Sequence, residues 1–174
     1  MGRIIVFLRS KIQSLVIIAL VLLGGLLLPG EPDRRAAISS ARSMIAYLAP
    51  ADAFVTNLFL KNLDTGETIQ LTDTENAVEG FVVSPNGMSI AYFEQNPDGA
   101  SDIWVVNLAD RKPHPVTNCG KSICRFPAWS PDSTQIAYER VDQGADGNRY
   151  SRVWVVDLAT LHSALLFDDV QILG

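Results

Sequence analysis

A ten-residue pattern that recurs three times at nearly constant spacing constrains the fold of this chain more than any other feature. Its copies begin at Ile38, Val83 and Trp129, and each copy ends in an Ile-Ala-Tyr triplet. The triplets lie 45 and 46 residues apart, and no gap interrupts the pattern. A fixed period in the 40s indicates a repeat architecture, and propeller blades are among the repeats of this length.

Each period contains the pieces of one four-stranded antiparallel blade, and the second period shows them best. It predicts an apolar strand at 80–83, a second strand at 89–94, a third at 102–108 and a short fourth at 115–117. The third stretch is nearly all apolar, which is typical of a strand covered on both faces. Two prolines near the fourth strand suit an edge, because proline cannot donate to a ladder.

Turns with a fixed chemistry connect the first and second strands of these blades. The predicted turn residues are Ser84, Pro85, Asn86 and Gly87 in the second period and Ser130, Pro131 and Asp132 in the third. These residue types are the preferences of a type I turn, so we predict structural roles for them. The first period is degenerate, as expected of a terminal repeat that lacks one neighbour.

The length sets a limit on how much of a propeller the chain can form. A chain of 174 residues accommodates three periods, at about 36–79, 80–125 and 126–174, whereas a closed propeller takes at least four blades. We therefore expect an all-β, partial propeller that is a truncated or split ring, a ring completed by other chains, or an open arc packed on a partner. An uncovered blade face is expected to expose Trp154 and Val156.

The N-terminal segment predicts a membrane anchor. Residues 12–28 are apolar except for Gln13 and Ser14, and three cations precede them at Arg3, Arg9 and Lys11. We predict a cytoplasmic basic region at 1–11, a transmembrane signal anchor at 12–29 and a linker at 30–35, with the repeats at 36–174 outside the cytoplasm. No A-x-A site follows the apolar run, so an uncleaved anchor is favoured over a cleaved signal peptide or a buried soluble helix.

Charge and motifs exclude several function classes. The net charge is −5, and residues 1–11 carry three cations and no acid, so the rest of the chain carries −8 by subtraction. Such an acidic domain argues against nucleic acid as a partner, because nucleic-acid binding depends on a basic face. No G-x-S-x-G elbow, P-loop or dinucleotide fingerprint occurs, so we expect no enzyme, no cofactor and no metal site.

The polar and sulfur-containing residues outside the turns have structural interpretations. Cys119 and Cys124 flank a short loop between the second and third periods. Outside the cytoplasm they are expected to form a disulfide, with two free buried thiols or a metal pair as alternatives. His114 and His162 fall in different blades and are expected at the outer rim. The oxygen-rich stretches 96–99 and 142–148 do not fit the spacing of an EF-hand loop and are predicted hairpin tips.

These motifs, taken together, resemble a known family of repeats. The turn at 84–87 with the triplet at 90–92, the strand at 102–108 and the pair at 116–117 are similar to the TolB-type, WD-like β-propeller repeat. The resemblance covers most of residues 38–167. It implies an extracytoplasmic propeller that serves as a platform for protein interaction. Similar repeats also form the propeller of prolyl-oligopeptidase-type peptidases.

The sequence therefore favours a membrane-anchored extracytoplasmic module that mediates protein–protein interaction, for example as an accessory subunit of a membrane complex. One alternative is the propeller part of a larger hydrolase, which a downstream G-x-S-x-G segment would favour. Another is a sensor of a small extracytoplasmic ligand, although three blades do not enclose a central funnel.

Overall fold

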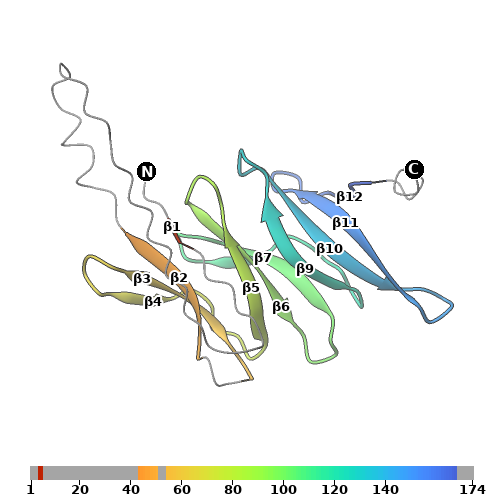
Figure 1. Cartoon of the computed structure of the whole chain (residues 1–174), viewed down its shortest axis with the longest axis horizontal. Coiled ribbons are helices and arrows are strands. Elements are labelled where there is room, and N and C mark those ends of the chain that lie inside the picture. The colour runs from red at the N-terminus through yellow and green to blue at the C-terminus, as the bar shows by residue number, and fades with distance from the viewer. Residues whose placement is uncertain (1–3, 6–42, 51–53, 168–174) are drawn as a thin grey trace, which may run out of the picture.

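The computed structural model describes residues 4–5, 43–50 and 54–167, and within these ranges every regular element is a β-strand. The strands form three antiparallel groups, which we call unit 1 (β2–β4), unit 2 (β5–β8) and unit 3 (β9–β12). Figure 1 shows the units side by side, with unit 2 between the other two. In the described part of the chain, no helix is long and apolar enough to cross a membrane.

Unit 2 is a meander of four strands. It comprises β5 (Ala77–Val83), β6 (Ser89–Gln95), β7 (Ser101–Asn107) and β8 (Pro113–Pro115), each antiparallel to the next. The predicted order of strands in this period is confirmed, but the edge strand lies at 113–115, two residues before the predicted 115–117. The inner strand β5 begins at Ala77, ahead of the predicted start at 80, and a bulge interrupts its pairing between Val78 and Gly80.

Unit 3 repeats this order with a longer central hairpin. It comprises β9 (Ile123–Trp129), β10 (Gln135–Gln143), β11 (Arg149–Asp157) and β12 (Ser163–Leu165). The predicted hairpin tip at 142–148 is shorter in the structure, because β10 and β11 remain paired as far as Gln143 and Arg149. A single parallel residue pair, Ser101 with Ile123, connects units 2 and 3 into one continuous sheet.

Unit 1 contains the degenerate first repeat. Its strands are β2 (Met44–Ala49), β3 (Asn57–Asn62) and β4 (Thr68–Gln70), and the two-residue β1 (Ile4–Ile5) pairs with β2 in parallel. The predicted anchor at 12–29, the linker at 30–35 and the start of the first repeat lie outside the described residues.

The core consists of two apolar layers, each between neighbouring units. Strand β6 contributes to both, because its side chains alternate between the two faces of the sheet. Ile90 and Tyr92 pack against unit 1, whereas Ala91 and Phe93 pack against unit 3. All four are buried. The predicted double coverage of the middle repeat is therefore confirmed, and the fold is all-β and propeller-like.

Candidate interaction surface

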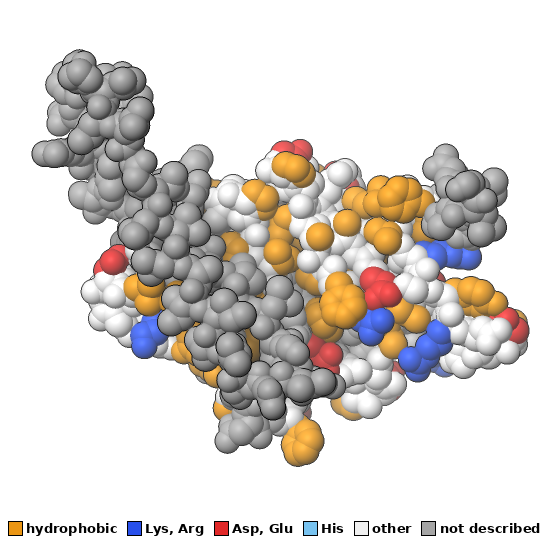
Figure 2. All heavy atoms as spheres, in the orientation of Figure 1, with side chains coloured by type: hydrophobic (Ala, Val, Ile, Leu, Met, Phe, Trp, Pro, Cys, Tyr) orange, Lys and Arg blue, Asp and Glu red, His pale blue; other side chains and the backbone are white. Residues whose placement is uncertain are grey.

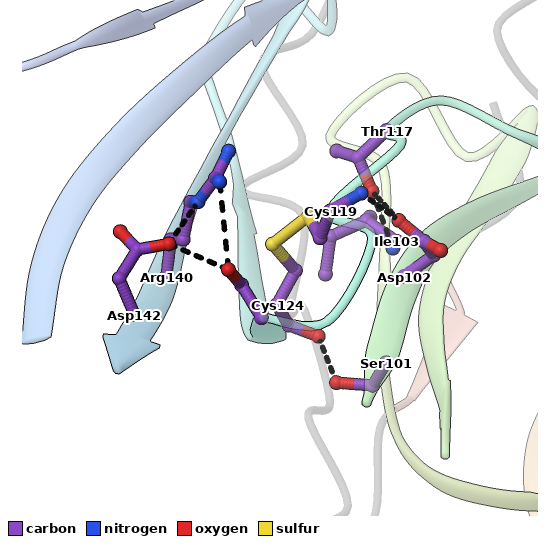
Figure 3. The surroundings of a disulfide bond; sticks show 9 residues. Ser101, Asp102, Ile103, Thr117, Cys119, Cys124, Arg140 and Asp142 are labelled. Carbon is purple, nitrogen blue, oxygen red and sulfur yellow. Dashed lines mark hydrogen bonds and ion pairs between the residues drawn. A yellow bond between two sulfur atoms is a disulfide. The ribbon is translucent and has the colours of Figure 1, made fainter. Parts of the chain in front are cut away.

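The link between units 2 and 3 is held by the predicted disulfide (Figure 3). Cys119 and Cys124 are bonded, their Cα atoms lie 6.3 Å apart, and both residues are buried. Ser101 donates a hydrogen bond of 2.7 Å from its hydroxyl to the carbonyl oxygen of Cys124. The loop between the units is thus fixed to β7 as well as closed on itself. Such a bond is typical of an oxidising, extracytoplasmic compartment.

A partly buried hydrogen-bond network holds the start of this link. One carboxylate oxygen of Asp102 accepts hydrogen bonds from the Thr117 hydroxyl at 2.9 Å and from the Cys119 amide at 2.7 Å. The same hydroxyl accepts a bond from the amide of Ile103. The link between units 1 and 2 uses the same device, because the side-chain oxygen of Asn57 accepts from the Thr72 hydroxyl and the Thr74 amide.

Strand pairing shows which residues are equivalent in the three units, and one equivalent position always carries a hydroxyl. Thr56, Ser101 and Ser151 occupy this position. The first two are buried, and each donates to a carbonyl oxygen on the inner strand of the next unit. Ser151 is exposed, and its hydroxyl donates to the carboxylate of Glu139 within its own unit.

The side chains around Ser151 form a surface that lies uncovered in unit 3, whereas the equivalent surfaces of units 1 and 2 are buried. We call it the open face, and its residues are Ala137, Glu139, Val153, Val155 and Leu166.

Comparison with unit 2 gives the magnitude of this exposure. Val153 is 40% exposed, whereas its equivalent Ile103 is 0% exposed. Leu166 is 46% exposed, whereas its equivalent Val116 is 2% exposed. Hydrophobic side chains are visible at the surface of unit 3 in Figure 2. The open face therefore has the composition and register of a face on which another sheet packs.

One ion pair interrupts the apolar character of the open face. The Arg125 guanidinium lies 2.6 Å from the Glu139 carboxylate and holds the pKa of Glu139 below its ordinary value, and the Ser151 hydroxyl adds to this effect. The neighbouring Phe126 has a φ of 56° and is exposed, and its ring packs edge-on against Phe93 of unit 2. Left-handed backbone is rare for a large aromatic residue, so this position is strained.

The expectation that an uncovered face would expose Trp154 and Val156 was wrong. Val156 is fully buried, and Trp154 packs against the apolar layer between units 2 and 3. Alternation along β11 places Val153 and Val155 on the opposite side, so the uncovered residues are the odd-numbered ones. Trp104 and Trp129 also pack against the apolar layers.

The predicted turn residues lie in the β5–β6 and β9–β10 turns and bond within them. Ser84 and Asn86 share a side-chain hydrogen bond of 2.7 Å, and the Gly87 amide donates to the Ser84 carbonyl at 2.8 Å. Pro85 and Pro131 are the second residues of the two turns. Ser130 and Asp132 share a bond of 2.6 Å, and hydrogen bonds from Ser130 and Thr134 lower the pKa of Asp132. These hydroxyls are therefore engaged in holding turns.

The remaining candidate ligands are separated in space or already bonded. His114 lies in β8 and His162 precedes β12, and both are exposed. At the β10–β11 tip, Asp146 accepts hydrogen bonds from Asn148 and from the Tyr150 hydroxyl. Across residues 43–50 and 54–167, no group of three or more His, Cys, Asp or Glu side chains is arranged to hold a metal.

The residues of the open face were not predicted from the sequence, although a signal for them was present. When the third strands of the periods are aligned, Val153 corresponds to Ile103 and Arg152 corresponds to Asp102. The third repeat has Arg152 and Phe167 at the positions of Asp102 and Thr117. It therefore lacks the Asp–Thr residue types found in the second repeat.

Comparisons with known proteins agree on the fold. No protein-family profile matches the chain. A curated relative, dipeptidyl-peptidase 5 of Porphyromonas gingivalis, is 29% identical over 92 residues, which span 49% of this chain and 14% of that protein. A TolB protein from Acinetobacter baumannii is similar with a TM-score of 0.53 and 18% identity, over 72% of this chain and 31% of its own.

A TolB-like protein from Agrobacterium tumefaciens gives a TM-score of 0.56 at 24% identity, over 72% of this chain and 45% of that one. The chain thus spans less than half the length of the proteins it matches. At these identities the similarity concerns the fold alone, and the chain has a TolB-like β-propeller fold.

Proposed function

We propose that this chain is a membrane-anchored, extracytoplasmic module of three propeller blades that binds another protein, as an accessory subunit of a membrane complex. Units 1, 2 and 3 are the three blades. The disulfide supports an oxidising compartment. The apolar segment at 12–28, with its basic flank, supplies the anchor.

The open face is the observation that carries this proposal. It presents the apolar side chains of Val153, Val155 and Leu166. In units 1 and 2 the side chains at the equivalent positions are buried. Water-exposed apolar area of this kind favours association, since each buried Å² contributes roughly 25 cal/mol. The open face also contains Glu139, whose carboxylate is paired with the Arg125 guanidinium.

Site-specific photo-crosslinking in the cells that make the protein tests the proposal. A photoreactive amino acid at Val153 is expected to yield a defined adduct with another polypeptide. The same residue at Lys112, which is exposed in the β7–β8 turn on the outer rim, serves as the matched control. Equal labelling from the two positions, or none from Val153, would contradict the proposal.

A second candidate function is the propeller part of a larger hydrolase. The match to dipeptidyl-peptidase 5 over 92 residues favours it. Immunoblotting of native extracts distinguishes the two candidates. A band far above the 19.0 kDa of this chain under denaturing conditions would favour the hydrolase.

A further inference from the structure

The first unit carries, on the side away from unit 2, the counterpart of the open face. We call it the leading face, and its residues are Ile45, Tyr47, Phe59, Lys61 and Leu63. Strand pairing makes its first three residues equivalent to Ile90, Tyr92 and Trp104 in unit 2 and to Ile136, Tyr138 and Trp154 in unit 3.

The likeness includes how the side chains pack. Tyr47 stacks on Phe59 with ring centroids 5.6 Å apart, and Tyr92 stacks on Trp104 at 6.4 Å. Leu63 corresponds to Leu108, which packs against the layer between units 1 and 2. Leu63 itself is 50% exposed.

Both interfaces inside the chain bring together these same two kinds of face. The layer between units 2 and 3 joins Ile103, Val105 and Val116 to Ile136, Tyr138 and Val156. The layer between units 1 and 2 joins Leu58, Leu60 and Leu71 to Ile90, Tyr92 and Val106. In each layer, the residues named first belong to the same kind of face as the open face. The residues named second belong to the same kind of face as the leading face. The chain therefore carries both halves of one further interface, at the two ends of the row of units in Figure 1.

Resting on the proposed function, we infer that the partner on the open face is a second copy of this chain, seated through its leading face. A contact of this kind is head-to-tail, and two copies related by a two-fold axis make it twice. The result is a closed ring of six units, within the range of four to eight that propellers adopt. Closure also leaves no further open face, so assembly stops at the dimer.

Unit 3 differs from units 1 and 2 at the two positions that anchor their outgoing links. Asn57 with Thr72 and Asp102 with Thr117 anchor the two described links to the next unit. Unit 3 has Arg152 and Phe167 at these positions. Lys61 is the one charged member of the leading face, and a lysine can lay its hydrocarbon stem on apolar surface while its ammonium stays in water.

The test is the molar mass of the full chain in mild detergent, measured by light scattering with the detergent subtracted. The expected protein mass is twice the 19.0 kDa of one chain. Val153→Glu on the open face and Leu63→Glu on the leading face are each expected to give monomers, weakening association by at least about tenfold because a buried unpaired charge costs more than 1.4 kcal/mol. Lys112→Glu on the outer rim is expected to leave the dimer intact.

Mixing the two monomeric variants gives the sharper result. Each variant retains the face that the other has lost, so a head-to-tail pair can form once, and association is expected to return in the mixture. Both positions are exposed, so both variants are expected to keep the circular dichroism spectrum of the wild type.

Three outcomes overturn the inference. They are a monomeric wild type, a Leu63→Glu variant that still dimerises, and a mixture that stays monomeric. A monomeric wild type whose crosslink from Val153 reaches a different protein would overturn the second copy as partner and leave the proposed function standing. A monomer without any specific adduct would overturn both.

Discussion

Loss of the Cys119–Cys124 disulfide is expected to lower the free energy of unfolding by about 2 kcal/mol. The bond closes a short loop, since the two cysteines are separated by five positions, and the loop-closure relation gives about 2 kcal/mol at 25 °C for a loop of this size. A larger loss is not expected from loop closure alone, because that contribution grows only slowly with loop length.

Urea unfolding of the full chain in mild detergent, followed by tryptophan fluorescence, provides the measurement. Trp129 and Trp154 pack against the layer beside the disulfide and report on it directly. The Cys119→Ala/Cys124→Ala double variant should match the reduced wild type and should be insensitive to reductant. A reductant effect under about 0.5 kcal/mol in the wild type would refute the loop-closure reasoning, and an equal effect in the double variant would show that reductant acts elsewhere.

Three further predictions concern single residues of units 2 and 3. Ser101→Ala is expected to cost about 1–3 kcal/mol by urea unfolding, because it leaves a buried carbonyl without its donor, whereas Ser151→Ala in the monomer should change stability by less than about 0.5 kcal/mol. Gly80→Ala should cost about 1–3 kcal/mol, because an added Cβ would lie 2.7 Å from the buried Phe93 ring, and Phe93→Leu should relieve part of that cost. Glu139 has a lowered pKa, so its contribution to stability is present above its ordinary pKa of 4.5 and is lost as the pH falls through the folded value. The stability difference between wild type and Glu139→Gln should therefore shrink below pH 4.5, and a constant difference down to full protonation would contradict the assignment.

The sequence predicted the strand order of units 2 and 3 because local and global signals coincide there. The Ser-Pro turn, the apolar strand 102–108 and the proline-containing edge each indicate the same element. The disulfide could be predicted because its two cysteines stand close together in a link whose compartment the N-terminal segment suggests.

The open face could not be predicted in the same way, because the choice of face depends on register. In a strand as apolar as 153–156, every residue is a candidate for burial, and a shift by one position exchanges the two faces. The expectation for Trp154 and Val156 failed for this reason. Only the pairing of β11 with β10 shows that Val153 is the residue on the uncovered side. The strained Phe126 lies at a register shift in the β9–β10 pairing, between the pairs Ala137–Ala128 and Glu139–Arg125, which leaves no local mark in the sequence.

The double burial of β6 has a consequence for how such a chain can change over generations. Because each apolar layer involves only two adjacent units, damage in one layer is expected to stay with its immediate neighbours. Whole units can then be duplicated or deleted with little redesign of those that remain. The cost of losing a unit falls on the two neighbours whose faces it had covered, so gene duplication is a ready route to rings of different size.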